Sequence, residues 1–406
     1  MLDINRIDEF LAELEKAKDD DELRHIFATY SAKYDLDVPK DPYGDAYRKQ
    51  QFDLYESLAQ KKYRPENEVT KFDVESASIS PFPYCHGSYD TVGNQLMAIG
   101  FVIKALALPK GAKILEFGPG WGNTTIALAK MGYEVTAVDI ENNFCRLIEQ
   151  RSALEKINIK VINADFNYIK SLNEKFDAIL YFECFHHADN HLDLMGEFDR
   201  ILNPGGRICF GAEPITPNFP LPWGLRMDGE SLWAIRKNGW LELGFNQTYF
   251  EDAMARFGWV LTFNKGEDSP WSSAIVAKRK TEVCEYYSTR DGALKTEVGK
   301  IKDGYIVSTG VAGYLVFGPY ATLPKGLWRA QFIVDENTQK YGKIFLDVVC
   351  EDGLQQLATK EIKLTNQTIN FSIDFQLPDS KRMIEVRVLV NKETSIGINN
   401  LKLSLN

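Results

Sequence analysis

A glycine-rich segment carries the clearest chemical signal in this chain. Glu116 to Asn123 reads EFGPGWGN and joins a predicted buried strand to a predicted helix, with its glycines spaced G-x-G-x-G. Glycines allow a ligand to lie against bare backbone amides at the N-terminus of a helix. Glu116, two residues before the first glycine, would repel a pyrophosphate and attract a cationic group. The segment therefore favours a nucleotide-type ligand that carries positive charge over a dinucleotide.

A second acid and a group of histidines extend this signal. Asp139 ends the apolar run that begins at Val135, where a carboxylate can accept both hydroxyls of a ribose. His186, His187 and His191, three of the five histidines, fall in one short loop. An imidazole with a near-neutral pKa suits proton abstraction. We predict that His187 is the base; the alternative for each of these histidines is a core or capping residue.

The elements that must position these residues follow from the hydrophobic pattern. From Lys113 to about Lys280, short apolar runs alternate with amphipathic stretches, which is typical of βαβ units and a parallel sheet. The predicted strands are Ile114–Phe117, Val135–Val138, Val161–Asn163, Ala178–Phe182 and Ile208–Gly211, and a closing antiparallel pair is predicted at Gly258–Phe263 and Ser273–Ala277. The predicted helices between them are Asn123–Met131, Asn143–Glu155 and Leu192–Leu202. Glu183 and Glu213 then lie with the histidines at the ends of the fourth and fifth strands.

A chain of 406 residues is long enough for two or three domains. Residues 1–75 are acidic and helical in pattern and predict an N-terminal helical cap. Residues 76–280 form the predicted α/β unit. Residues 284–406 alternate with period two between turn signals, which predicts an all-β sandwich of jelly-roll type.

The α/β unit resembles the class I S-adenosylmethionine (SAM)-dependent methyltransferases. The resemblance is carried by five motifs in order over about 170 residues: ILEFGPGWGN at Ile114–Asn123, AVDI at Ala137–Ile140, NADF at Asn163–Phe166, FDAILYFECFHH at Phe176–His187 and LNPGG at Leu202–Gly206. It implies a Rossmann-like sheet with SAM as the cofactor. It also implies that the chain is an enzyme that transfers a methyl group.

The resemblance implies roles for individual residues around SAM. Glu116 and Gly118 to Gly122, including Gly120, line the methionine moiety, Asp139 holds the ribose, Asp165 and Phe166 flank the adenine, and Phe182 lies near the sulfonium; Asn123 and Ile140 also count as cofactor-binding residues. Tyr84, His86 and Gln95 close over SAM from the N-terminal side, or else belong to a packed connection. The catalytic candidates are His187 as base, His186 orienting SAM or substrate, and Glu183 and Glu213 orienting the base or holding sugar hydroxyls.

A metal ion offers a different use of the same loop. Glu183, His187 and Glu213 could instead hold a divalent ion that binds and acidifies a diol. The sequence leaves this alternative open, and full turnover of metal-stripped enzyme would eliminate it.

The insert after the fifth strand predicts the acceptor. Trp223, Arg226, Asp228 and Glu230 lie in a stretch stiffened by proline and glycine, which suits stacking on a sugar ring with carboxylates on its hydroxyls. A hydrophobic lid over the sheet is the alternative. The insert and the FPY segment near Pro81 resemble bacterial methyltransferases of cell-surface polysaccharide assembly.

The sandwich adds an association with sugars. The stretch Tyr314–Phe332 is similar to carbohydrate-binding modules, although its aromatics would serve a structural or dimerising unit equally well. Exposure of Tyr320, Trp328 or Tyr341 on one concave face would favour sugar binding.

Charge and hydropathy limit the partners. The formal net charge of −10 provides no broad basic field, which disfavours nucleic acid and membrane surfaces as partners. The N-terminus is charged from its third residue and no apolar run reaches the ~20 residues of a membrane span, so we expect a cytoplasmic protein. A homo-oligomer is compatible with the sequence.

These observations lead to one preferred function and several alternatives. We predict a SAM-dependent O-methyltransferase that acts on a sugar hydroxyl of a surface polysaccharide or its precursor. The alternatives are a methyltransferase of another small molecule and a non-catalytic glycan-binding or scaffold protein that retains a SAM pocket. An NAD-dependent sugar oxidoreductase is disfavoured by Glu116, which opposes a pyrophosphate.

Overall fold

The computed structural model describes residues 4–33, 39–80, 82, 88–267, 269, 271–280, 283–351, 353–378 and 381–405. The chain divides into two compact units. The first comprises residues 1–259 and 264–277, and the second comprises residues 260–263 and 278–406.

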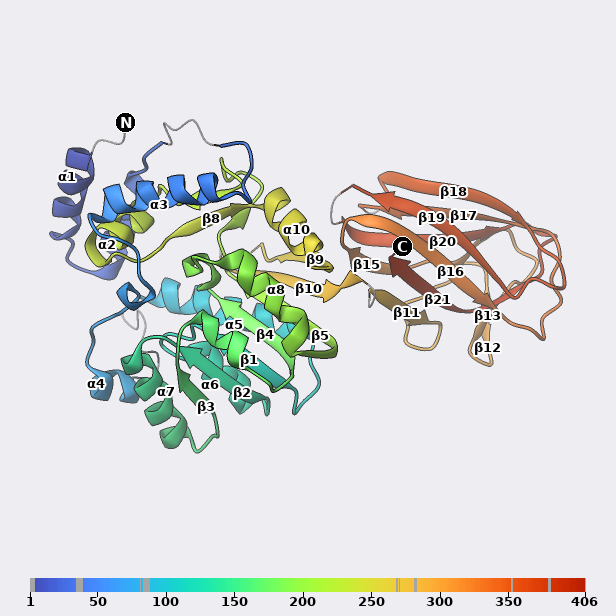
Figure 1. The fold of residues 1–406 in the computed structure, drawn as a ribbon. Coiled ribbons are helices and arrows are strands. Elements are labelled where there is room, and N and C mark those ends of the chain that lie inside the picture. Colours follow the sequence, from blue (N-terminus) through green and yellow to red (C-terminus); the bar gives the residue numbers. More distant parts are fainter. Residues whose placement is uncertain are drawn as a thin grey trace. The chain divides into compact units, whose positions relative to one another are not determined.

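A seven-stranded sheet organises the first unit, in the order β3-β2-β1-β4-β5-β10-β9 (Figure 1). Its strands are β1 (Lys113–Phe117), β2 (Glu134–Asp139), β3 (Lys160–Asn163), β4 (Phe176–Phe182), β5 (Leu202–Gly211), β9 (Trp259–Lys265) and β10 (Ser273–Arg279). The pairs β1–β2, β2–β3, β1–β4 and β4–β5 are parallel. The order reverses between β1 and β4, which is where sheets of this kind bind ligands at the carboxyl ends of their strands.

The helices of the sheet region are α5 (Tyr89–Leu106), α6 (Asn123–Lys130), α7 (Asn142–Glu155), α8 (His191–Ile201) and α10 (Gln247–Arg256), with short 3-10 turns η2 (Phe166–Ser171) and η3 (Phe185–His187). Helix α5 supplies Ala98 and Val102 to a core that includes Ile114 of β1 and Leu180 of β4. The prediction of a Rossmann-like parallel sheet with helices between its strands is confirmed.

The fifth strand begins earlier than the predicted Ile208. The LNPGG segment begins β5, so this strand starts at Leu202 and spans ten residues. Gly205 adopts a φ of 74°, and the register with β4 shifts between Phe176 and Ala178. The glycine therefore makes a local irregularity within the strand, and the pairing with β4 continues beyond it.

The N-terminal segment packs against the insert that follows β5. Its elements are α1 (Ile4–Leu14), α2 (Asp20–Thr29), α3 (Asp45–Ala59), η1 (Pro65–Asn67) and α4 (Val74–Ile79), and those of the insert are β6 (Ile215–Thr216), β7 (Trp223–Leu225), α9 (Gly229–Trp233), the π-helical turn η4 (Ala234–Asn238) and β8 (Leu243–Asn246). The sequence predicts that the insert is a stretch stiffened by proline and glycine. In the structure it forms a small sheet in the order β6-β8-β7. Tyr47 of α3 donates a hydrogen bond to the Trp223 carbonyl at 2.7 Å, so the two segments are built together.

Two antiparallel sheets form the second unit, which confirms the predicted all-β domain. One contains β12-β13-β21-β16-β19 with β11, and the other contains β14-β20-β17-β18 with β15. Their strands are β11 (Cys284–Ser288), β12 (Lys300–Lys302), β13 (Tyr305–Val307), β14 (Gly313–Val316), β15 (Pro319–Leu323), β16 (Gly326–Val334), β17 (Lys343–Cys350), β18 (Gln355–Lys363), β19 (Asn370–Leu377), β20 (Lys381–Val390) and β21 (Gly397–Leu405). Alternate residues of both sheets form one buried core.

The aromatic residues of the sandwich do not share one environment. Trp328 is fully buried in the core, and its indole N–H donates to the Pro324 carbonyl. Tyr320 is half-buried, with its hydroxyl 3.2 Å from Glu385, whereas Tyr341 is 50% exposed. Trp328 therefore cannot serve as a stacking platform.

Among the described helices, none combines the length and the apolar character that crossing a bilayer requires.

Candidate active site

A cavity of about 420 Å³ lies at the carboxyl ends of the central strands in the first unit. Nine residues predicted from the sequence line it: Gly118, Gly120, Asp139, Ile140, Asp165, Phe166, Glu183, His187 and Glu230. They come from the loops after β1, β2, β3 and β4 and from α9 in the insert. The fold thus collects six of the predicted cofactor residues, two of the catalytic candidates (Glu183 and His187) and one of the acceptor candidates (Glu230) around a single space.

The glycine segment turns sharply between β1 and α6. Gly118, Gly120 and Gly122 have φ values of 57°, 51° and 73°, in the left-handed region that favours glycine. A Cβ atom at Gly118 would lie 2.7 Å from the Cβ of Cys184, which is closer than two carbons can approach. The glycine is therefore required both by the turn and by the contact with the loop after β4.

Asp139 fixes the glycine segment from the neighbouring strand. Its Oδ2 accepts the Gly120 N–H at 2.9 Å, and its Oδ1 accepts the Glu141 N–H at 2.8 Å. Burial raises the pKa of Asp139 to about 6, against the lowering effect of these two hydrogen bonds. Each oxygen retains a lone pair, so the carboxylate can also accept the hydroxyls of a ribose.

Glu116 is a buried acid, and the nearby Thr125 hydroxyl of α6 opposes the rise of its pKa. The residue is 1% exposed, and neither carboxylate oxygen is within hydrogen-bond geometry of a donor among the described residues. Burial raises the pKa of Glu116 to about 7, and the Asp139 carboxylate adds to this effect. A buried polar group without a hydrogen bond is costly, and a cationic ligand group beside it would remove the cost. This carboxylate fits the ammonium group of SAM.

Four other predicted cofactor residues lie behind the cavity lining. Asn123 begins α6 and donates to Gln95 Oε1 of α5 at 3.1 Å, so this pair ties two helices together. Gly122 precedes that helix and Phe182 ends β4, with a side chain 9% exposed. Tyr84 and His86 lie outside the described residues.

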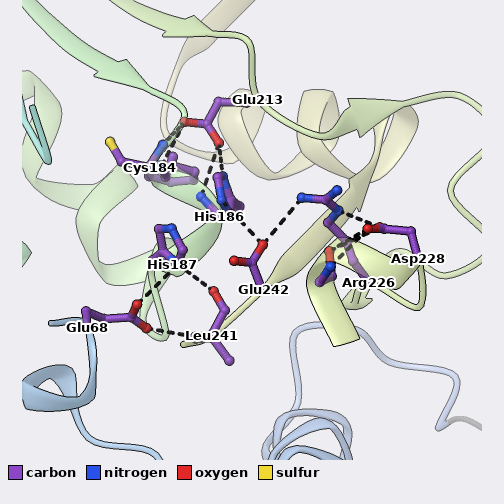
Figure 2. A network of polar contacts seen from close by, with 11 residues as sticks. Glu68, Cys184, His186, His187, Glu213, Arg226, Asp228, Leu241 and Glu242 are labelled. Atoms are coloured by element: carbon purple, nitrogen blue, oxygen red, sulfur yellow. Dashed lines mark hydrogen bonds and ion pairs between the residues drawn. The ribbon is translucent and has the colours of Figure 1, made fainter. Parts of the chain in front are cut away.

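Glu213, just beyond β5, organises the loop after β4 (Figure 2). Its carboxylate accepts the backbone N–H groups of Cys184, Phe185 and His186 at 2.8, 2.7 and 3.2 Å. It also lies 2.9 Å from Nδ1 of His186. Glu213 therefore shapes the histidine loop and orients His186.

His186 lies between two carboxylates. Its Nδ1 faces Glu213, and its Nε2 is 3.6 Å from Oε2 of Glu242. Burial alone would lower the pKa of His186, but the Glu213 and Glu242 carboxylates raise it above its ordinary value. On the far side, Arg226 reaches Glu242 at 3.4 Å and Asp228 at 3.0 Å. The result is a mostly buried row of groups with alternating charge.

His187 differs from its neighbour because it reaches the cavity and is held by a carbonyl. Its Nδ1 lies 2.7 Å from the Leu241 carbonyl and 3.5 Å from the Glu68 carboxylate. Burial and the neighbouring His186 lower the pKa of His187 well below its ordinary value. Because a carbonyl can only accept, Nδ1 carries the proton of the neutral ring and Nε2 keeps a lone pair. A general base or a metal ligand needs this lone pair.

Glu183 faces the cavity from a strained backbone position. Its φ of 51° is unusual for a residue with a side chain, and such strain costs about 1 kcal/mol or more. Burial raises the pKa of Glu183 to about 7, while His186 opposes the shift. Strain of this kind persists where the surrounding structure holds it, here through the Glu183 N–H bond to the Gly211 carbonyl at 3.0 Å.

The predicted acceptor residues separate into two groups. Glu230 lines the cavity, but Trp223 is 2% exposed and donates its indole N–H to the Pro42 carbonyl. Arg226 and Asp228, with side chains 24% and 44% exposed, form the outer end of the row of charges, where Asp228 also caps α9. These three therefore support the wall of the cavity from behind.

Several lining residues were missed by the sequence reasoning. Trp233 and Trp240, with ring centroids 6.2 Å apart, face the cavity from the insert, and Trp121 and Phe144 do so from the sheet side. Others come from the N-terminal segment: Leu23, Arg24, Phe27, Tyr63, Pro65, Glu68 and Thr70. Trp121 falls within the Gly118–Gly122 range that the resemblance places around the methionine moiety, although it is not singled out there. Nothing in the sequence around Glu68 indicates contact with a loop more than a hundred residues away.

Comparison with known proteins bears on the matched part of the first unit. Residues 115–210 match the family model described as "Methyltransferase domain". This stretch contains the glycine loop, Asp139, Asp165 and the histidine loop. Residues 115–210 form a class I methyltransferase domain. The cofactor of this methyltransferase domain is S-adenosyl-L-methionine.

The curated relatives align with the same part of the chain. A "S-adenosyl-L-methionine-dependent Diels-Alderase" of Neonectria sp. (strain DH2) is 35% identical over 112 residues, which are 27% of this chain and 41% of the relative. A "Demethylmenaquinone methyltransferase" of Tropheryma whipplei (strain Twist) is 29% identical over 106 residues, covering 26% and 43%. The chain thus spans less than half the length of these two relatives.

Among solved structures, a similar chain is the 1,6-didemethyltoxoflavin-N1-methyltransferase of Burkholderia thailandensis. It is 17% identical, the match covers 48% of this chain and 83% of that one, and the TM-score is 0.35.

Proposed function

We propose that this protein is a SAM-dependent O-methyltransferase that acts on a hydroxyl of a saccharide. The observation that carries the proposal is the pairing of two features around one cavity: Asp139 and the glycines Gly118 and Gly120 on the β1–β2 side, and His187 after β4. SAM, when bound, supplies a methyl group already activated by its positive sulfur.

The cofactor half of the proposal assigns roles to two acids. Glu116 binds the ammonium group, because its buried carboxylate has no donor within hydrogen-bond geometry in the described residues. Asp139 binds the ribose and at the same time holds Gly120 in place. Asp165 and Phe166, which line the cavity, flank the base.

The acceptor half rests on the chemistry of a hydroxyl. A hydroxyl oxygen attacks the methyl carbon in line, its O–H bond breaks, and the carbon–sulfur electron pair stays on sulfur. A nitrogen lone pair at His187, on the cavity wall, serves this step as the proton acceptor that the sequence predicts. Glu183 and Glu230 also line the cavity, where they can accept hydrogen bonds from further hydroxyls of the same acceptor.

A saccharide suits the remaining wall. Trp233 and Trp240 lie beside Glu230 on the insert, and aromatic faces combined with carboxylates are suited to a sugar ring and its hydroxyls. These two tryptophans replace Trp223 as the candidates for stacking. The bacterial surface polysaccharide or its precursor remains the proposed source of the sugar.

The experiment measures cofactor binding and methyl transfer separately. Calorimetric titration with S-adenosylhomocysteine (SAH) and with NAD tests the pocket, and incubation with methyl-labelled SAM and a panel of nucleotide sugars and oligosaccharides tests the reaction. We expect SAH but not NAD to bind, and label to appear on a sugar oxygen. Binding of NAD alone would reject the enzyme class, and label on nitrogen or carbon only would reject O-methylation.

A second candidate function follows from the Diels-Alderase relatives. If this chain used SAM without consuming it, SAM would bind but no SAH would form with any acceptor. Formation of SAH in proportion to methylated product rules this candidate out. The non-catalytic scaffold predicts the same lack of SAH and, in addition, no chemical change in any ligand.

A further inference from the structure

Two buried donor groups and one half-buried group converge at the cavity wall. One nitrogen of His186, one nitrogen of His187 and one carboxylate oxygen of Glu242 all lie within 4.8 Å of one another. His186 and Glu242 are each 7% exposed, and His187 lines the cavity. Figure 2 shows the three side chains arranged around a common space between the histidine loop and the insert. Imidazole nitrogens and a carboxylate oxygen are ligands that metal ions use in proteins.

Each histidine has one ring nitrogen already engaged by an oxygen. Nδ1 of His186 lies 2.9 Å from the Glu213 carboxylate, and Nδ1 of His187 lies 2.7 Å from the Leu241 carbonyl. Metal-bound histidines almost always donate their other N–H group to a carboxylate or a carbonyl, which fixes the ring. Both rings therefore already have the hydrogen-bond partner at Nδ1 that metal-bound histidines usually have. Nε2 of each ring is the nitrogen left to bind an ion.

The spacing of one pair of donor atoms also fits an ion. Nε2 of His186 and Oε2 of Glu242 are 3.6 Å apart, which is too long for a hydrogen bond. Two ligand atoms bound at ~2.1 Å to a tetrahedral ion lie ~3.4 Å apart. Arg226 contacts the same oxygen of Glu242 at 3.4 Å and so holds the carboxylate from behind.

The charges around this cluster leave room for a cation. Six carboxylates act on one another or on the histidine pair: Glu68, Glu183, Glu213, Glu230, Glu242 and Asp228. The basic side chains that act on the same groups are Arg24, Lys61 and Arg226. The acidic side chains around the cluster thus outnumber the basic ones.

We propose that His186, His187 and Glu242 bind one first-row divalent transition-metal ion, with water or an acceptor oxygen completing its coordination. Two imidazoles with one carboxylate suit zinc or cobalt and do not suit magnesium, which prefers oxygen ligands. This set of ligands differs from the one considered in the sequence analysis, which consists of Glu183, His187 and Glu213. Glu213 is instead occupied by three backbone N–H groups and orients a ligand.

The role of the ion toward the acceptor rests on the proposed function. A hydroxyl bound to the ion has a lowered pKa, so its proton passes to water in the cavity as the oxygen bonds to the methyl carbon. In this form the lone pair of His187 is a ligand, and the ion takes over the activation that the sequence assigns to a base.

The test is metal binding by the full-length chain, purified without a histidine tag and stripped with a chelator. Titration with Co²⁺ should produce the visible absorption of a bound ion that saturates at one ion per chain, and Zn²⁺ should abolish it by displacement. Glu242→Gln and His186→Gln should each weaken Co²⁺ binding by about 10- to 100-fold. The control is His25→Gln, which changes an exposed histidine of α2 and should bind Co²⁺ like the wild type. SAH binding, measured on the same samples, shows that each variant is folded.

The outcomes separate the metal site from the proposed function. Saturable Co²⁺ binding that the two cluster variants lose and the control keeps supports the site, even if no acceptor is ever methylated. Wild-type protein that binds SAH but neither Co²⁺ nor Zn²⁺ overturns it, and so does full methyl transfer by stripped enzyme. In that last case the proposed function stands with His187 as the base.

Discussion

The carboxylate of Glu213 holds His186 twice, by accepting its backbone N–H at 3.2 Å and by lying 2.9 Å from its ring Nδ1. Because Glu213 follows β5 and His186 follows β4, this contact joins the ends of two neighbouring strands. The contact also sets the position of His187, the next residue along the chain. A change at position 213 should therefore affect the histidine loop as a whole.

Asp139→Ala should weaken SAH binding by about 10- to 100-fold, which corresponds to ~1–3 kcal/mol for lost charge-assisted hydrogen bonds. The loss has two sources, because the side chain also holds the Gly120 N–H. Calorimetry against wild type measures it, with Asp193→Ala, an exposed carboxylate of α8, as the control. Unchanged affinity would mean that Asp139 does not contact the ribose.

Glu116→Gln should remove a pH dependence from both stability and SAH binding. The folded apoprotein keeps the Glu116 proton up to about pH 7, whereas the unfolded chain loses it near 4.5. The contribution of Glu116 to the free energy of unfolding is therefore lost as the pH rises through this window, by up to about 3 kcal/mol. SAH should bind more tightly as the pH rises, because the ionised carboxylate attracts its ammonium group.

Denaturant unfolding and calorimetry at pH 5 and pH 8 measure both effects of Glu116. The stability of the glutamine variant relative to wild type should rise between these two values, and its SAH affinity should change less with pH. If the stability and SAH affinity of wild type and variant change with pH in the same way, then Glu116 has no raised pKa in the folded protein and does not contact the ligand.

His187→Ala should reduce methyl transfer by about 100-fold or more while SAH affinity stays close to wild type. The ring lines the cavity, so its loss affects the acceptor side, whereas Asp139 and Glu116 on the cofactor side are untouched. Turnover with labelled SAM and calorimetry with SAH give the two readouts. Normal turnover would remove His187 from the catalytic residues.

Arg226→Met should lower the free energy of unfolding by about 3 kcal/mol, because it leaves the Glu242 carboxylate buried without its arginine. The double variant Arg226→Met/Glu242→Gln should recover part of the loss, since the uncompensated charge is then gone. Urea unfolding of the four proteins of this cycle gives the interaction energy. Strictly additive effects would mean that the two side chains do not interact.

A chain truncated after Lys280 should remain soluble and bind SAH, if the β-sandwich is an independent domain as the sequence predicts. The sandwich has its own buried core, although Val260 of β9 packs against that core. Size-exclusion chromatography and SAH titration of the truncated chain provide the test. Aggregation would instead indicate that the sandwich covers apolar surface that must stay buried.

The methyltransferase fold could be predicted from the sequence because its signals are local. The apolar runs at β1 and β2 and the glycines between β1 and α6 fix a strand, a turn and a helix within a few residues of one another. The acid Asp139 follows from the same pattern. These elements required no knowledge of distant contacts, and the structure has them close to the expected bounds.

The acceptor side could not be predicted to the same extent because it depends on contacts between distant segments. Glu242 reaches His186 from another part of the chain, and Glu68 reaches His187 from the N-terminal segment. Trp223 is a residue type that often stacks on sugar rings, which made it a candidate. Its contacts with Tyr47 and Pro42 instead bury it. Such partners come from tertiary packing, which the periodicity of a sequence does not encode.

The near contact of Gly118 with Cys184 bears on how this protein can change. The sulfur of Cys184 lies 3.0 Å from the Phe117 carbonyl, and no side chain fits at position 118. A larger residue at position 118 or 184 would push the loop after β1 and the loop after β4 apart. The cavity-lining residues of the N-terminal segment and the insert lie outside this contact and can change without moving either loop. New acceptor preferences should therefore evolve, or be engineered, through the N-terminal segment and the insert, while the 118–184 junction stays fixed.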